Sequence, residues 1–143
     1  MSDARNVGVD EAKAELIGFI DSDDYIDEDV YNNVPEAQVV DKKTWELSPR
    51  EAIKMVMEAK ILSVTAVNKL YKKSLFSELR FEIGKIAEDA FIMIKLLDKC
   101  NKIVTTNEKK YYYVHRENSI TTQKFSLKFL NVIEAYEQNK EII

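Results

Sequence analysis

The chain has 143 residues, of which 45% are hydrophobic and 32% are charged, with a formal net charge of −4. This composition is typical of one globular domain and excludes a disordered or fibrous protein. The negative charge argues against a nucleic-acid partner, because phosphate binding needs clustered Lys and Arg side chains. The longest stretch without a charged residue, Ile61–Asn68, is too short to span a membrane. With no signal peptide visible either, we expect a cytoplasmic protein, in solution or at the periphery of a membrane.

A helix and a short strand are predicted first along the chain. Val7, Val9 and Ala12 contribute to an apolar face at helical spacing, which predicts a helix over residues 3–15. Residues 16–20 then form an unbroken apolar run that ends at an aspartate. A run without alternating polar residues is typical of a strand covered on both faces, as in a parallel sheet.

Helices and strands continue to the end of the chain, which predicts an α/β domain over residues 1–143. Ser48, followed by Pro49 and Glu51, has the pattern of a capping box and opens a helix to about residue 60. Ser126 is the predicted cap of a final helix that reaches residue 143. The other predicted elements are helices over residues 68–75 and 88–100 and strands over residues 102–106 and 111–116, which are joined by a polar turn.

Three carboxylates, Asp21, Asp23 and Asp24, directly follow the predicted strand at residues 16–20. In open α/β sheets, ligands bind beyond the carboxyl ends of the strands. In an extended backbone Asp21 and Asp23 point the same way, about 6.6 Å apart. Neighbouring carboxylates repel one another unless a cation or solvent separates them, and oxygen ligands favour Mg²⁺ or Mn²⁺. A solvated acidic loop fits the composition equally well.

A calcium-binding EF-hand is excluded, although the letters DSDDYIDED imitate the start of its loop. The sixth position of such a loop needs glycine and the twelfth needs glutamate. Ile26 and Asn32 occupy these two positions here.

Several motifs in order along the chain resemble family 2 inverting glycosyltransferases of the GT-A fold. The segment SDARNVGVDEAKAELIGFIDSDDY resembles a helix with the pattern S-x-x-R-N-x-G that leads into a strand ending in D-S-D-D. The likeness continues in NKLYKKSLF, RFEIGKIAEDAFIMIKLL and YYYVHRENSIT. The resemblance implies a partial GT-A, Rossmann-like nucleotide-diphospho-sugar transferase fold with a helix-rich C-terminal part. Residues 1–31 would form the metal and donor segment, and residues 48–143 the acceptor side.

The resemblance also implies a donor site around the acidic turn. Asp21 and Asp23 would form the Asp-X-Asp motif, with Asp23, accompanied by Asp24, nearest to Mn²⁺ or Mg²⁺. Arg5 and Asn6 would approach the nucleotide. The donor would be a nucleotide-diphosphate sugar, whose negative charge the cation would balance.

Glu88 and Asp89 open the predicted helix over residues 88–100. Acidic residues are common in a first helical turn because they complement the helix dipole. In the resembling family the Asp of this pair is the general base, which would take the proton from an acceptor hydroxyl. Asp89 would then be the base, and Glu88 would orient it or the acceptor.

His115 and Arg116 lie at the end of the last predicted strand. A lone histidine in this position is more often a surface or packing residue. The family often has a basic residue here that meets the diphosphate. Arg116 is therefore the preferred donor contact, because guanidinium groups bind phosphate through two hydrogen bonds.

The first βα units of the resembling family have no counterpart in this chain. An apolar parallel strand normally has neighbours on both edges, so we expect a homo-oligomer or a complementing polypeptide to cover residues 16–20. Two functions stay open. One is transfer of a sugar, with inversion, to the hydroxyl of a glycan or other acceptor, in the synthesis of surface polysaccharide or glycan. The other is a catalytically inactive domain that acts by association or regulation.

Overall fold

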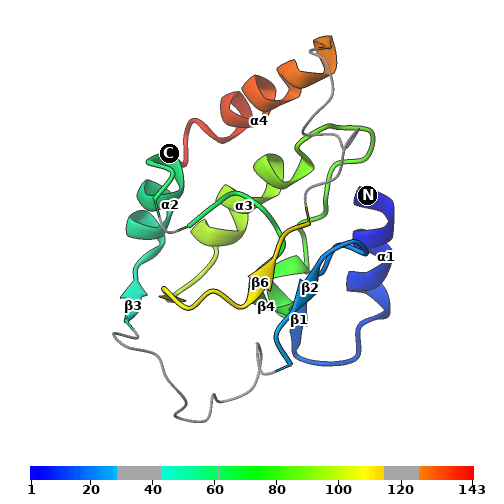
Figure 1. The fold of residues 1–143 in the computed structure, drawn as a ribbon. Coiled ribbons are helices and arrows are strands. Elements are labelled where there is room, and N and C mark those ends of the chain that lie inside the picture. The colour runs from blue at the N-terminus through cyan, green and yellow to red at the C-terminus, as the bar shows by residue number, and fades with distance from the viewer. Residues whose placement is uncertain (29–42, 61, 115–125) are drawn as a thin grey trace.

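The computed structural model describes residues 1–28, 43–60, 62–114 and 126–143 and shows a mixed α/β fold (Figure 1). Its sheets are short, and helices make up most of the regular structure. In chain order the elements are α1 (Ser2–Glu11), β1 (Leu16–Gly18), β2 (Tyr25–Ile26), β3 (Thr44–Leu47), α2 (Pro49–Met57), β4 (Leu70–Lys72), the 3₁₀ helix η1 (Lys73–Phe76), α3 (Glu88–Asp98), β5 (Ile103–Thr106), β6 (Tyr111–Tyr112), the 3₁₀ helix η3 (Leu127–Leu130) and α4 (Asn131–Asn139).

Strand pairing in the described residues is antiparallel throughout. The pairs are β1 with β4, β2 with β6, and β3 with β5. The prediction of a parallel strand covered on both faces is therefore wrong for β1. Ile17 and Phe19 are buried, whereas Leu16 and Ile20 are 50% and 47% exposed. One face of this segment packs on the core and the other does not, as is common in antiparallel sheets.

Helix α3 is the centre of the hydrophobic core. Seven of its apolar side chains are buried, on all sides of the helix, and α2 and α4 pack against it. A helix that is apolar all round is expected in the middle of a domain. The helix ends at Asp98, close to the predicted end at residue 100. Its buried apolar residues are Ala90, Phe91, Ile92, Met93, Ile94, Leu96 and Leu97.

A cluster of aromatic rings fills the core around β1 and β4. The Phe19 ring packs edge-on against Tyr71, Phe76 and Phe81, with centroids 5.4–5.9 Å apart. Such edge-to-face contacts add to the free energy gained from burial of the rings. The cluster fixes the strand that precedes the acidic turn and the loop that runs beside α1.

Helix α1 turns a partly polar face inward. Ser2, Arg5 and Val9 are buried, whereas Val7, which was predicted to face the core, is 60% exposed. The helix also ends at Glu11 rather than at residue 15. Because Ser2 and Arg5 are polar, the spacing of apolar residues alone does not identify the inward face of α1.

Helix starts and strands elsewhere follow the predictions in part. The capping box of Ser48 and Glu51 is present at the start of α2. Residues 68–75, predicted as a helix, instead form β4 followed by η1. The predicted strands at 102–106 and 111–116 correspond to β5 and β6, but they pair with β3 and β2 rather than with each other.

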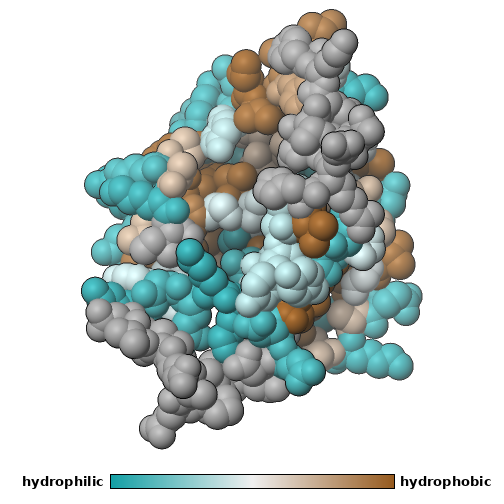
Figure 2. All heavy atoms as spheres, viewed as in Figure 1, coloured by the Kyte–Doolittle hydropathy of each residue, from teal (hydrophilic) through white to brown (hydrophobic). Residues whose placement is uncertain are grey.

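The final helix packs on α3 through a buried asparagine. The Asn139 side chain donates to the carbonyl oxygens of Ala90 and Ala135 at 3.3 and 2.8 Å. Ser126 makes no side-chain capping bond, and η3 precedes α4. Leu127 and Ile133 remain 77% and 60% exposed. In the view of Figure 2, hydrophobic surface gathers toward the top of the molecule, and the surface lower down is mostly hydrophilic.

Candidate functional site

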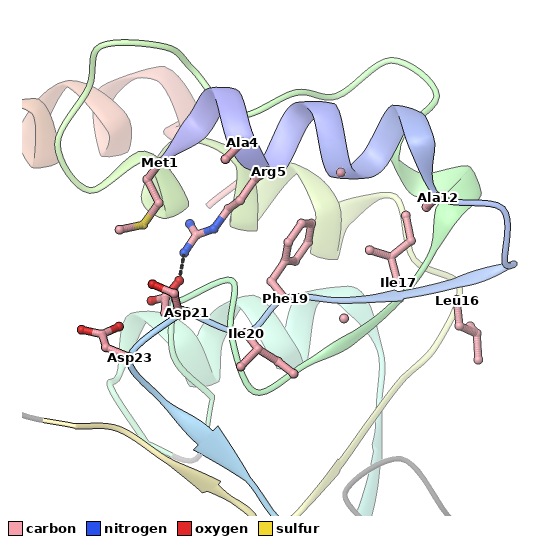
Figure 3. Close-up of a pocket in the computed structure, with 13 residues that line it drawn as sticks. Met1, Ala4, Arg5, Ala12, Leu16, Ile17, Phe19, Ile20, Asp21 and Asp23 are labelled. Carbon is pink, nitrogen blue, oxygen red and sulfur yellow. Dashed lines mark hydrogen bonds and ion pairs between the residues drawn. The ribbon is translucent and has the colours of Figure 1, made fainter.

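Three segments far apart in the sequence bring charged side chains together at one end of α1. The guanidinium of Arg5 contacts Asp89 Oδ1 at 2.5 Å and Glu88 Oε1 at 2.9 Å through Nη1. Its Nη2 contacts Asp21 Oδ1 at 3.0 Å, as the dashed line in Figure 3 marks. Asp21 follows β1, and Glu88 and Asp89 open α3. The fold therefore joins the two acidic motifs that the sequence singled out. We call these four residues the Arg5 cluster.

Arg5 is held inside the protein rather than at its surface. Its side chain is 8% exposed, and its guanidinium carbon lies 5.4 Å from the centre of the Phe81 ring. Burial alone would lower the pKa of Arg5, but the charges of Asp89, Asp21 and Glu88 raise it above its ordinary value. The guanidinium is thus a fixed positive charge among three carboxylates.

Both carboxylate oxygens of Asp89 accept hydrogen bonds. Oδ1 accepts from Arg5, and Oδ2 accepts from the backbone N–H of Ala66 at 2.9 Å. Burial raises the pKa of Asp89 above its ordinary value, against the opposing effects of the Arg5 charge and the Ala66 hydrogen bond. A carboxylate with a raised pKa is a stronger base, which is what removal of a hydroxyl proton requires.

Asp24 is committed to holding the acidic turn in place. Its Oδ2 accepts a hydrogen bond of 2.5 Å from the Tyr111 hydroxyl, and its Oδ1 accepts one of 2.8 Å from the Val114 N–H. The turn itself is closed by a bond from the Asp24 N–H to the Asp21 carbonyl. Burial, followed by the hydrogen bond to Asp24, raises the pKa of Tyr111 above its ordinary value. These contacts join the turn to β6.

The cation site at Asp21, Asp23 and Asp24 stays a prediction. No group of three or more His, Cys, Asp and Glu side chains among the described residues lies close enough together to hold a metal ion. The reason lies in the contacts above, because Asp21 turns toward Arg5 and Asp24 toward Tyr111. Mg²⁺ is commonly held by only one or two carboxylates together with substrate phosphates. Asp21 and Asp23 have the chemistry of that smaller ligand set, and their binding of a cation stays a prediction.

A groove of about 610 Å³ runs between α1 and the segment from Leu16 to Asp23 (Figure 3). Ala4 and Gly8 are among the residues that line it from α1, and Met1, directly before the helix, also lines it. Small side chains on that helix leave room between the two elements. The acidic residues Asp21 and Asp23 lie at one end of the groove.

Asn6, predicted to approach the nucleotide, is bonded to the protein backbone. Its side-chain N–H donates to the Phe81 carbonyl and its side-chain oxygen accepts from the Phe81 N–H, both at 2.9 Å. The amide therefore ties α1 to the loop before α3. A contact between Asn6 and a nucleotide stays a prediction. Arg116 and His115 lie outside the described residues, so the predicted diphosphate contact of Arg116 also stays a prediction.

Lys69 is a member of the site that the sequence did not reveal. Its ammonium donates to the Thr65 carbonyl at 2.7 Å and to Ser63 Oγ at 3.4 Å. Burial lowers the pKa of Lys69 to about 8, and the charge of Asp89 opposes this shift. The preceding residue, Asn68, has a φ of 60°, a conformation that asparagine tolerates better than most residues. That asparagine was the one signal in the sequence for an unusual backbone next to the lysine.

Comparison with known proteins points in one direction. No protein-family model matches the chain. Two proteins of Streptococcus pneumoniae serotype 4 (strain ATCC BAA-334 / TIGR4) are similar to it. Glycosyltransferase GlyA is 28% identical over 85% of this chain and 22% of its own length. Glycosyltransferase GlyG is 27% identical over 93% of this chain and 55% of its own length.

The chain thus spans 22% of the first relative and 55% of the second. Both relatives are named glycosyltransferases. In the described part of the chain, no helix has both the length and the hydrophobicity to cross a membrane.

Proposed function

We propose that the chain is part of an inverting family 2 glycosyltransferase of the GT-A type, and that it transfers a sugar from a nucleotide-diphosphate donor to an acceptor hydroxyl. One observation carries the proposal: the carboxylate after β1 and the acidic pair that opens α3 lie on the two sides of one guanidinium. A transferase of this kind needs a donor-side and an acceptor-side carboxylate near each other. The similarity to two proteins named glycosyltransferases supports the same reading.

On the donor side, Asp21 and Asp23 would hold Mn²⁺ or Mg²⁺, and Asp24 would keep the turn in place through Tyr111. A bound divalent cation would balance the negative charge of the donor diphosphate. Arg116 would add a second positive charge toward the leaving group. The acidic turn itself would otherwise repel such a donor.

On the acceptor side, Asp89 would be the general base. As the acceptor oxygen forms its bond to the anomeric carbon, the bond to the diphosphate breaks on the opposite face and the hydroxyl proton passes to Asp89. Glu88 shares the Arg5 guanidinium with Asp89 and would help to orient the base or the acceptor. Surface polysaccharide or another glycan is the acceptor class we propose.

The Asp89→Asn variant tests this assignment. The change keeps the size of the side chain but removes the proton acceptor, so we expect the rate of transfer to fall by ~10²–10⁴ while donor binding stays nearly intact. Release of nucleotide diphosphate from a panel of nucleotide sugars, with Mn²⁺ and mixed glycan acceptors, measures the rate. Circular dichroism of the variant provides the control for folding.

An unchanged rate in the Asp89→Asn variant would remove this residue from the mechanism. A wild-type chain that binds metal and nucleotide but releases no diphosphate from any donor would favour the inactive association domain instead.

A further inference from the structure

The contacts of Arg5 suit a role toward Asp89 better than a contact with the nucleotide. Three of the five N–H groups of its guanidinium donate to carboxylates of the protein, two from Nη1 and one from Nη2. The side chain is 8% exposed. Most of the hydrogen-bonding capacity of this guanidinium is therefore directed at carboxylates of the protein itself.

The charge balance of the cluster makes Arg5 essential to it. Three carboxylates, those of Asp21, Glu88 and Asp89, surround one positive charge. Like charges at this spacing oppose one another's ionisation, and burial adds to that effect. Burial raises the pKa of Asp89 and the Arg5 charge opposes that rise, so loss of the guanidinium would favour the protonated form of Asp89.

The geometry also fixes where the Asp89 carboxylate points. Arg5 holds Oδ1 and the Ala66 N–H holds Oδ2, so the carboxylate is anchored at both oxygens by two separate segments. An oriented base is what a proton transfer in a transition state requires. The same guanidinium reaches Asp21, so the donor-side turn and the base share one anchor.

We propose that Arg5 is the positioning residue of this site: its guanidinium keeps Asp89 ionised and in one orientation, and ties it to the acidic turn after β1. The inference rests on the proposed function, in which Asp89 is the base. It replaces the predicted contact of Arg5 with the nucleotide by an action through another residue.

Two substitutions of Arg5 separate charge from geometry. Arg5→Lys keeps a positive charge but lacks the fork that contacts several carboxylates at once, whereas Arg5→Met removes the charge. Arg50→Met, an exposed arginine at the start of α2, is the matched control. Besides Arg5, the charged groups that act on Asp89 are Glu88, Asp21 and Lys69, and all three stay unchanged in these variants.

The first readout is the titration of the Asp89 carboxyl, followed by NMR with ¹³C-labelled aspartate. We expect its midpoint to rise in Arg5→Met, to rise less in Arg5→Lys and to stay in place in Arg50→Met. The second readout is the pH–rate profile of transfer. In Arg5→Met the midpoint of its acidic limb should shift to a pH about one unit higher, so the rate at a pH well below that midpoint should fall about tenfold. The loss of rate in Arg5→Lys should be smaller.

An Asp89 titration that is the same in wild type, Arg5→Lys and Arg5→Met overturns the inference. If Arg5→Met does not fold, the comparison of wild type with Arg5→Lys decides in the same way. The titration of Asp89 can be measured without turnover, so the two proposals can fail separately. If the Asp89 midpoint depends on Arg5 but the protein turns over no donor, the proposed function fails and the role of Arg5 toward Asp89 stands.

Discussion

Asp24 illustrates how much a single side chain contributes to the shape of the candidate site. The carboxylate was predicted as part of a cation site because it follows an apolar strand. In the structure both of its oxygens accept hydrogen bonds from β6 and the residues after it. The sequence indicates which residues are charged, but it does not show that Tyr111, 87 residues further along, provides the donor.

Tyr111→Phe should destabilise the fold by about 1–2 kcal/mol, because it removes a hydrogen bond to a charged carboxylate. Urea unfolding at pH 7 measures this difference. Tyr136→Phe is the matched control, since its hydroxyl has no hydrogen-bond partner among the described residues. A loss no larger than that of the control would contradict the assigned role.

The difference in stability between wild type and Tyr111→Phe should depend on pH. The pKa of Tyr111 in the folded protein is raised above the ordinary value of about 10, so the folded state keeps the hydroxyl proton more tightly. The stabilisation is fully present below about pH 10 and is lost as the pH rises beyond that value. The advantage of wild type over Tyr111→Phe should therefore shrink above about pH 10.

At the scale of elements, the predictions succeeded where local chemistry decides the structure. The capping box of α2 and the apolar length of α3 depend on residues within one or two turns, and both were read from the sequence. The strand that pairs with β1 was not predicted from the sequence. An apolar run at 16–20 is compatible with a parallel or an antiparallel neighbour, and the pairing with Leu70–Lys72 depends on residues far along the chain.

Ser48 and Ser126 form a natural pair for testing helix capping. Both were predicted as N-caps, but only Ser48 makes a capping bond: its hydroxyl accepts from the Glu51 N–H while the Glu51 side chain accepts from the Ser48 N–H. Ser48→Ala should cost about 1 kcal/mol of stability, and Ser126→Ala should cost much less. Chemical denaturation of the two variants compares them directly. Equal losses would show that the capping bond adds no stability to α2.

At the scale of the whole molecule, the candidate site depends on contacts between distant parts of the chain. Arg5, Asp21 and Asp89 come from α1, the turn after β1 and the start of α3, and α3 in turn is held by the core. The motifs predicted that these residues belong to one site. They did not predict that a buried guanidinium would join them. The buried face of a helix is predicted from its apolar residues, and a charged residue such as Arg5 is assigned to the solvent side.

Self-association remains a prediction at this scale. Within the described residues β1 pairs only with β4, and Leu16 and Ile20 are about half exposed beside the groove. Unpaired strand edges with apolar side chains recruit partners. We expect a homodimer or higher assembly at micromolar concentration in light scattering, and we expect Ile20→Lys to dissociate it.

Ile133→Lys, on the exposed side of α4, is the control for that experiment. Dissociation by this variant rather than by Ile20→Lys would place the contact on α4. A monodisperse wild-type monomer that unfolds cooperatively would contradict the prediction of assembly altogether.

The most direct test of the central claim, that the acidic turn and the Arg5 cluster form a nucleotide-sugar site, is calorimetry with UDP and other nucleotide diphosphates, with and without Mn²⁺. We predict binding that is markedly tighter with the cation and that Asp23→Ala abolishes without loss of the fold. No binding of any nucleotide diphosphate, or binding that neither Mn²⁺ nor Asp23→Ala alters, would contradict the claim.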